Sequence, residues 1–240
     1  MTMHMILALA AVAIFGISTA GAQTERTYVG ASGMLSVQGS HRQGTAPSLP
    51  TTGAEGTAIG VTAEAGAWLS PRVALGFEVS FPRRFRSVQQ IDHLRVFQYE
   101  SRHRDTAISG LFRAIAVSGH GMQLGIVGGG GYVQESTRQR RRDQVGPLPT
   151  FPPVFGPYST ESSVTRWTAA ALVGADVEVA MSSHIAIVPQ MRVHFIRRSD
   201  DPSQPGWALG LNSIVLRAAL GVRAVFGGSQ RCFILNNRER

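Results

Sequence analysis

Polar and apolar residues alternate along most of the chain from residue 24 onward, and little of it repeats at the helical period. A period of two is typical of β-strands whose two faces lie in different surroundings. Each alternating segment is long enough for a tilted strand to cross a bilayer, which takes roughly 9 to 11 residues. The pattern predicts eight strands, at residues 26–38, 56–69, 73–82, 104–117, 122–135, 163–180, 184–197 and 208–226.

The last predicted strand shows the alternation clearly. Between residues 213 and 226 one face is apolar, whereas Arg217 and Arg223 interrupt the other face. Because side chains along a strand point alternately to opposite sides, both arginines lie on the same face. We expect the apolar face to contact lipid and the two arginines to turn inward, to carboxylates in the interior of a barrel.

The connections between the predicted strands alternate in length. Those at 70–72, 118–121 and 181–183 are short, whereas those at 82–103 and 138–162 are long. Short turns at one end and long loops at the other are typical of outer-membrane barrels, and long structureless loops are uncommon in compact soluble domains. We therefore predict an all-β fold, an eight-stranded antiparallel up-and-down transmembrane β-barrel with both termini in the periplasm.

The predicted inward faces carry small residues together with charges of both signs. Small side chains suit the narrow interior of an eight-stranded barrel, and a buried charge that loses its partner costs about 3 to 5 kcal/mol. We expect a charge-balanced lumen network of Glu64, Glu78, Arg113, Asp176, Glu178, Arg192, His194, Arg217 and Arg223. Alternation alone leaves open a secreted soluble β-barrel binding protein, whose arginines would face water.

Aromatic residues lie at the ends of the predicted strands, where rings would meet the headgroups of a bilayer. They are Phe81, Tyr132, Trp167, Phe195, Trp207 and Phe226.

Residues 1–22 differ from the rest of the chain. An apolar run from Met5 to about Ile17 is followed by Ala20-Gly21-Ala22, which is the small-x-small pattern of a cleavage site. The run is short for a spanning helix, which needs roughly 20 residues. We predict a cleaved signal peptide at 1–22, a barrel at 23–226 and a short periplasmic tail at 227–240, with an uncleaved anchor as the alternative.

Composition narrows the classes of partner. The formal net charge is +8 and all basic side chains are arginine, yet only 16% of residues are charged. With so few charged residues we expect no nucleic-acid partner, since a nucleic-acid binder would concentrate basic residues on one helix or patch. The single cysteine, Cys232, excludes an internal disulfide and a cysteine-based metal cluster. We expect neither a cofactor nor a metal.

The chain resembles the small eight-stranded outer-membrane barrels, a family that includes the transmembrane domain of outer-membrane protein A and the opacity-type surface proteins. The resemblance covers about residues 24–226 and rests on the leader, the eight alternating strands, the uneven connections and the final ALGVRAVF. It implies the outer membrane of a Gram-negative-type bacterium, contact with lipid and lipopolysaccharide, and insertion by the barrel-assembly machinery. The implied assembly signal falls on Leu220, Val222, Ala224 and Phe226. The chain departs from the family pattern because residues 227–240 follow Phe226.

Arginines gather in the two long connections. They are Arg83, Arg84, Arg86, Arg138, Arg140, Arg141 and Arg142. Such clusters attract the phosphates of lipopolysaccharide or acidic glycans, although a merely solvated run of charge fits the same pattern. The proline- and aromatic-rich residues 147–158 suit an exposed contact segment or a plug over the barrel mouth.

Catalytic patterns are weak in this sequence. His194, Ser199 and Asp200 supply the residue types of a triad but straddle a strand end and a loop. No helix start follows Gly128–Gly131, which favours a strand over a phosphate-binding loop. We expect a non-enzymatic, monomeric barrel with a structural or surface-interaction role. The alternative is a narrow porin-like channel through the lumen network, with His194 as a titrating group.

Overall fold

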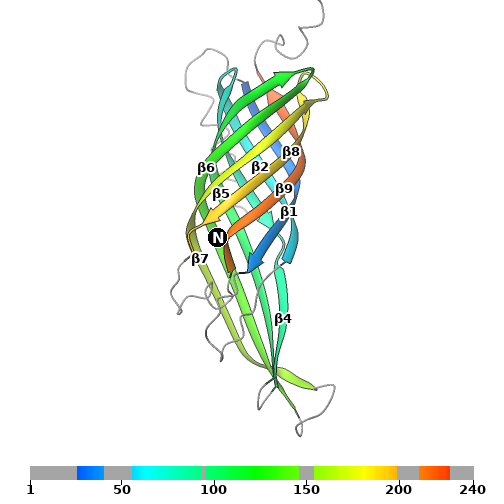
Figure 1. Cartoon of the computed structure of the whole chain (residues 1–240), viewed down its shortest axis with the longest axis vertical. Coiled ribbons are helices and arrows are strands. Elements are labelled where there is room, and N and C mark those ends of the chain that lie inside the picture. The colour runs from blue at the N-terminus through cyan, green and yellow to red at the C-terminus, as the bar shows by residue number, and fades with distance from the viewer. Residues whose placement is uncertain (1–25, 41–55, 93–95, 146–153, 199–210, 228–240) are drawn as a thin grey trace, which may run out of the picture.

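The computed structural model describes residues 26–40, 56–92, 96–145, 154–198 and 211–227, which form β-strands and their turns (Figure 1). The strands are β1 (Arg26–Ser40), β2 (Gly56–Ser70), β3 (Val73–Pro82), β4 (Phe85–Asp92), β5 (Val96–Gly119), β6 (Met122–Gln144), β7 (Phe155–Ala180), β8 (Ile185–Ile196) and β9 (Leu211–Phe226). Within this part of the chain, no helix is long and apolar enough to cross a membrane.

The strands form a closed antiparallel ring. Strands that follow one another in the sequence pair side by side, except for β3 and β4. β1 pairs with β9 and so closes the barrel. β3 and β4 pair one after the other along β5 and count as one barrel strand, interrupted at Arg83-Arg84. The ring therefore has eight strands, and the predicted fold class is confirmed.

The tight turns lie together at one end of the ring. They join β2 to β3, β5 to β6 and β7 to β8. In the β5–β6 turn, His120 and Gly121 both have positive φ, 50° and 76°, as a two-residue hairpin turn of the primed kind requires.

The distribution of side chains across the wall is opposite to that of a soluble barrel. Inward positions are polar or charged and buried, among them Ser32, Thr62 and Ser109. Large apolar side chains cover the outer face and are exposed, including Leu35, Ile59, Val61, Leu75, Phe112, Ile126, Val173, Met191, Leu216, Leu220 and Val222. A wall of this kind is stable in lipid, so the soluble alternative is wrong.

The aromatic rings follow the predicted placement where the structure describes them. Tyr132, Trp167 and Phe195 are exposed on the outer face toward the open end of the barrel, and Phe226 is exposed near the turn end. Phe81 is partly exposed. Trp207 lies outside the described residues, as do the predicted leader and residues 228–240 of the tail.

Four strands continue beyond the rest of the barrel (Figure 1). β4 pairs with the start of β5, β6 runs to Gln144, and β7 begins at Phe155. The prediction of long loops at 82–103 and 138–162 is therefore wrong, because most of these residues form a β-sheet. We call residues 85–92, 96–104, 136–144 and 155–165 the strand extension.

Apolar alternation in the sequence does not predict the strand extension, for a physical reason. Apolar alternation arises where one face contacts lipid, whereas both faces of these strands are largely polar. Opposite charges across the ladder support the pairing instead: Arg140 lies opposite Glu100 on β5 and Glu161 on β7.

Candidate functional site

The structure places the whole predicted lumen set inside the barrel. Each side chain is buried, with at most 5% of its residue surface exposed: Glu64, Glu78, Arg113, Asp176, Glu178, Arg192, His194, Arg217 and Arg223. Six of the strands contribute, since β2, β3, β5, β7, β8 and β9 each place at least one of these residues on their inward face.

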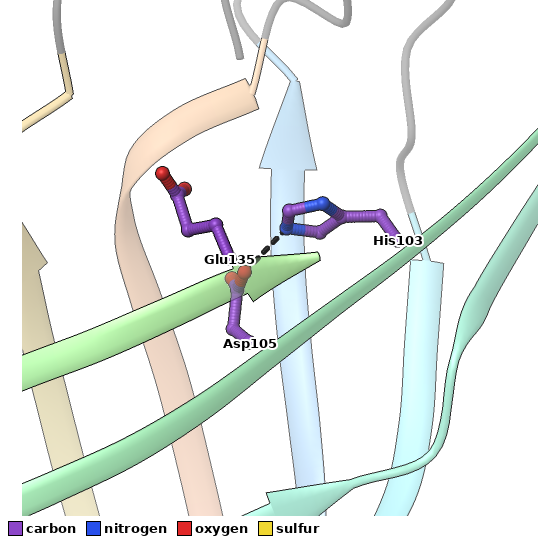
Figure 2. A group of neighbouring side chains, drawn as sticks. All are labelled: His103, Asp105 and Glu135. Carbon is purple, nitrogen blue, oxygen red and sulfur yellow. Dashed lines mark ion pairs between the residues drawn. The ribbon is translucent and has the colours of Figure 1, made fainter. Parts of the chain in front are cut away.

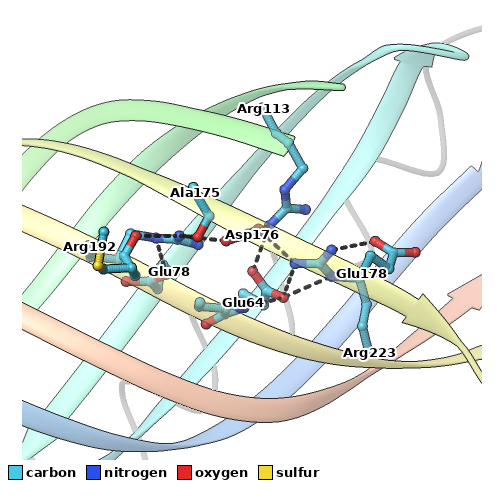
Figure 3. Close-up of polar contacts among 10 residues, drawn as sticks. Glu64, Glu78, Arg113, Ala175, Asp176, Glu178, Arg192 and Arg223 are labelled. Atoms are coloured by element: carbon cyan, nitrogen blue, oxygen red, sulfur yellow. Dashed lines mark hydrogen bonds and ion pairs between the residues drawn. The ribbon is translucent and has the colours of Figure 1, made fainter. Parts of the chain in front are cut away.

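Most of these charges form one network in the middle of the barrel (Figure 3). Arg223 reaches Glu64 at 2.6 Å, Glu178 at 2.6 Å and Asp176 at 3.1 Å. Arg113 contacts Glu64 at 3.0 Å and Asp176 at 2.5 Å from another side. Each of the two central carboxylates therefore accepts from more than one guanidinium group, which is how buried charge is stabilised.

Arg192 extends the network toward the open end of the barrel. It contacts Asp176 at 2.5 Å and Glu78 at 3.3 Å (Figure 3). Gly174 lies beside it without a side chain, because a Cβ there would come within 2.9 Å of the Arg192 Cδ atom.

Arg217 departs from the expected pairing with carboxylates. It forms no ion pair with a described carboxylate and instead donates to the Ser80 hydroxyl and, at 3.1 Å, to the backbone carbonyl of Asp105. Its Nη1 also lies 3.4 Å from His194 Nε2. The prediction that both arginines of the last strand meet carboxylates is correct for Arg223 and wrong for Arg217.

Tyr28 closes the network toward the turn end and is not among the residues predicted for the lumen. Its ring lies between two guanidinium groups, 4.9 Å from Arg113 and 5.0 Å from Arg223. Gly66 and Gly76 make room for it, since a Cβ at either position would lie 2.5 Å from the Tyr28 hydroxyl. Trp68 and Val225 pack against the same ring.

A second charged cluster, also missed, lies near the open end of the barrel (Figure 2). His103 Nε2 contacts Asp105 at 2.5 Å, and Arg198 contacts Asp105 at 3.0 Å and Glu135 at 2.6 Å. Arg166 binds the other oxygen of Glu135 at 2.6 Å. The strand parity could have found this cluster, because Asp105 and Glu135 share the inward face with Arg113 and Val133.

Three residues of this cluster have metal-ligand chemistry. The donor atoms of His103, Asp105 and Glu135 lie within 4.8 Å of one another. However, the Arg198 guanidinium already bridges the two carboxylates, and a cation would have to displace it. We therefore interpret the cluster as a structural closure of the barrel mouth.

The outer face of the strand extension carries a different site. A pocket of about 160 Å³ is lined by Arg84, Arg102, Ser136, Arg138, Glu161 and Ser163, and we call it the outer arginine pocket. Ser136, Arg138, Glu161 and Ser163 have the same strand parity as Tyr132 and Trp167, so they point away from the barrel interior.

Like charges face one another across the strands at this pocket. Arg102 lies directly opposite Arg86 on β4 and Arg138 on β6. Such a row is unfavourable unless anions lie beside it. Glu161 supplies one anion, contacting Arg138 and, at 3.0 Å, Arg140. Glu100 supplies another, contacting Arg86 at 3.0 Å and Arg102 at 2.8 Å.

Glu100 is the best-enclosed carboxylate among the side chains of the strand extension that the structure describes. The Tyr158 hydroxyl donates a hydrogen bond to it, and together with Arg102 and Arg86 this lowers the pKa of Glu100 to about 2. Tyr158 also accepts from Arg142, whose guanidinium lies 4.1 Å from the ring centroid. Tyr158 belongs to β7, so the predicted irregular contact segment 147–158 is wrong at its C-terminal end; residues 146–153 lie outside the described part of the chain.

The predicted anion-contact arginines lie on or beside strands and only some of them line the pocket. Arg84 and Arg138 line it, whereas Arg83 and Arg86 are exposed beside it. Others are engaged within the sheet: Arg140 with Glu161, Arg141 with Asp143, and Arg142 with Tyr158. The picture of freely solvated basic loops is corrected accordingly, because carboxylates accompany several of these arginines.

The remaining predicted sites are placed as follows. Leu220, Val222 and Phe226 are exposed on the outer face of β9, and Ala224 is half-buried there. Gly128–Gly131 lie within β6, as expected of a strand. His194 is buried in the lumen, while Ser199 and Asp200 lie outside the described residues.

No family model matches the sequence, and no curated protein is significantly similar to it. Solved structures do match along most of the chain. Neisserial surface protein A is 12% identical, with a TM-score of 0.43, and the match covers 83% of this chain and 97% of that one. Ail, the attachment invasion locus protein of Yersinia pestis, is 8% identical, with a TM-score of 0.44, and the match covers 85% of this chain and 100% of that one. OprG from Pseudomonas aeruginosa is 12% identical, with a TM-score of 0.44, and the match covers 87% of this chain and 99% of that one. Another structure of Ail holds the heparin analogue sucrose octasulfate.

The closed ring of eight strands and the apolar outer wall decide the assignment of the fold. The chain has the fold of the small outer-membrane β-barrels. The similar structures are barrels of this kind, as the resemblance in the sequence implies.

Proposed function

We propose that this barrel resides in the outer membrane and binds anionic molecules of the cell surface through the outer arginine pocket, with lipopolysaccharide of its own leaflet as the ligand. Its role is to hold the outer leaflet and the protein together, and it carries out no catalysis. The barrel-assembly machinery inserts it through the outward residues of β9.

One observation carries this proposal, namely the position of the pocket on the wall. Tyr132 and Trp167 mark the level at which aromatic rings meet headgroups. Ser136 and Arg138 follow Tyr132 by four and six residues on the same face of β6. At about 3.3 Å per residue and a tilt of about 40°, they lie roughly 10 to 15 Å beyond the rings. The pocket therefore faces the phosphates and sugars of neighbouring lipids.

The chemistry of the pocket suits that ligand. Three guanidinium groups face one carboxylate, so the pocket keeps a positive charge. Guanidinium forks pair with phosphate oxygens through two parallel hydrogen bonds, and the hydroxyls of Ser136 and Ser163 add further donors. The side chains that a phosphate group needs are thus present on a rigid sheet.

The alternative function, a narrow channel, finds less support in the interior. Tyr28, the central charge network and the Arg198 cluster fill the barrel at three successive levels. An eight-stranded barrel is just wide enough for side chains to fill, so buried groups at three levels support a packed interior.

Binding of lipopolysaccharide to the purified, refolded protein tests the proposal. The test variant is Arg84→Gln with Arg138→Gln, and the matched control is Arg72→Gln with Arg141→Gln, which removes the same charge outside the pocket. Arg102 is left unchanged because it holds Glu100. We expect the test variant to bind at least about tenfold more weakly, since one charge-assisted hydrogen bond corresponds to about that factor.

Salt provides a second readout. Binding by the wild type and the control should weaken with rising ionic strength, because exposed charges are screened. Equal binding by the test variant and the control, or no binding by the wild type, would refute the proposed function.

A further inference from the structure

The outer arginine pocket already contains an anion that belongs to the chain. The two oxygens of Glu161 bind different arginines: Oε1 accepts from Arg138 Nε at 2.5 Å, and Oε2 accepts from Arg140 Nε at 3.0 Å. A phosphate group presents oxygens to neighbouring guanidinium groups in the same way. Glu161 therefore lies where an incoming phosphate would bind.

We propose that the pocket binds one phosphate monoester group from a lipid of the surrounding leaflet, and that Glu161 occupies the place of this group until it arrives. This inference rests on the proposed function and adds the chemical group and the residue that competes with it. Binding exchanges the carboxylate of Glu161 for the phosphate on Arg138, and no covalent bond changes.

The Glu161 ion pairs are suited to exchange because they are accessible. The side chains of Glu161 and Arg138 are 43% and 38% exposed. Exposed ion pairs contribute little net stability, so losing them costs little. The ion pairs of the lumen, by contrast, are buried, with the side chains of Arg113, Glu64 and Arg223 only 1–2% exposed.

The other donors of the pocket remain available to the phosphate. Arg84 is exposed and forms no ion pair with a carboxylate of the described residues. Arg102 uses its Nε and Nη2 atoms for Glu100 but keeps a further nitrogen. The row formed by Arg86, Arg102 and Arg138 retains more positive charge than its carboxylates neutralise. A phosphate monoester carries a charge of about −1.5 to −2 at neutral pH, which suits this surplus better than a single carboxylate does.

The volume agrees with a ligand of this size. About 160 Å³ corresponds to roughly five water molecules at about 30 Å³ each. This is enough for a phosphate group and the first atoms of the sugar or glycerol that carries it.

The charge of Glu161 persists at neutral pH. Its slight desolvation raises the pKa, but the hydrogen bonds and charges of Arg138 and Arg140 outweigh this and lower it below the ordinary value. Glu161 therefore repels a phosphate group as well as occupying its place, and both effects disappear when it is replaced by glutamine.

Glu161→Gln is the variant that tests this inference. If Glu161 competes with the ligand, the variant binds inorganic phosphate about two- to tenfold more tightly than the wild type, in the range that exposed ion pairs provide. If Glu161 only braces β6 against β7, the same substitution weakens binding or leaves it unchanged, and either result overturns the proposal. The Arg84→Gln/Arg138→Gln variant should lose phosphate binding and serves as the reference.

Vesicles distinguish a lipid source from free phosphate. The full-length protein is reconstituted in phosphatidylcholine vesicles that contain either phosphatidic acid, a monoester, or phosphatidylglycerol, a diester. We expect tighter association with phosphatidic acid, measured by quenching of Trp167 with brominated lipid, and a further gain in Glu161→Gln. Equal association with the two lipids would refute the monoester, and association with neither would refute the lipid source.

The two proposals fail in different ways. Loss of lipopolysaccharide binding in the Arg84→Gln/Arg138→Gln variant, without any gain of phosphate binding in Glu161→Gln, supports the proposed function and refutes the competition by Glu161. Tighter phosphate binding in Glu161→Gln, with no lipopolysaccharide binding by the wild type, gives the opposite result.

Discussion

At the scale of single residues, Tyr28 shows how the interior is stabilised without a hydrogen bond. Its ring lies between Arg113 and Arg223, and its hydroxyl has no hydrogen-bond partner in the described structure. The contribution of Tyr28 therefore comes from the ring, through cation–π contacts and the filling of space beside Gly66 and Gly76.

Two substitutions of Tyr28 separate the ring from the hydroxyl. We expect Tyr28→Ala to lower the free energy of unfolding by about 3 to 5 kcal/mol, because it removes a buried ring and leaves a cavity. Tyr28→Phe should be close to neutral, since it removes only an unpartnered buried hydroxyl. Urea unfolding in phospholipid vesicles, followed by tryptophan fluorescence, measures both. A phenylalanine variant as unstable as the alanine variant would show that the hydroxyl carries the stability.

The sequence predicts which residues point inward better than it predicts their partners. The parity of Arg217 and Arg223 on the last strand is enough to place both inside the barrel. Their partners depend on the stagger between strands that are far apart in the sequence. This stagger brings Glu64 to Arg223 and leaves Arg217 beside Ser80 and His194. No local pattern contains that information.

At the scale of elements, the strand extension is held by polar contacts between neighbouring strands. Glu100 on β5 is the centre of one such group, with Tyr158 on β7 and Arg86 on β4 among its partners. The sequence predicts the membrane-spanning part of these strands and misses their continuation, because lipid contact imposes apolar alternation and water contact does not. The pocket on the extension therefore required the structure, although two of its arginines, Arg84 and Arg138, could be named in advance.

The strand extension should loosen in acid. The pKa of Glu100 is about 2 in the folded protein, against an ordinary value of 4.5. A depressed carboxylate pKa contributes stability that is fully present above the ordinary value and is lost as the pH falls through the folded value. We therefore expect cleavage of the extension by pepsin to rise between pH 4.5 and pH 2, measured by mass spectrometry of the fragments.

Glu100→Gln is the control for this prediction. It removes the titrating group, so its extension should be cleaved to a similar extent across this range once the activity of pepsin is normalised on an unfolded substrate. The same pH dependence in the variant and the wild type would mean that another group controls the loosening.

At the scale of the whole molecule, buried polar and aromatic side chains occupy the interior at three levels. Tyr28 lies toward the turn end, the Arg223 network in the middle, and the His103, Asp105 and Arg198 cluster near the open end. The three levels share no side chain, so removing one side chain leaves the other levels in place.

We expect the wild type to show no stable unitary currents in planar bilayers. Arg192→Gln should also show no unitary currents, because the side chains at the other levels of the interior remain in place. Heat-modifiable gel mobility shows in the same samples that the protein has folded. Stable currents that change in Arg192→Gln or Glu178→Gln would contradict this prediction and favour a channel.

The strand extension continues β4, β5, β6 and β7 beyond the mouth of the barrel, whereas β1, β2, β8 and β9 do not extend as far (Figure 1). The protein therefore presents different surfaces on different sides within the plane of the membrane. Lipids retained by the pocket would collect in one sector of the ring of lipids around it and turn with the protein as it rotates. A neighbouring protein would then meet either bare barrel wall or a wall already covered by lipid, depending on the direction of approach.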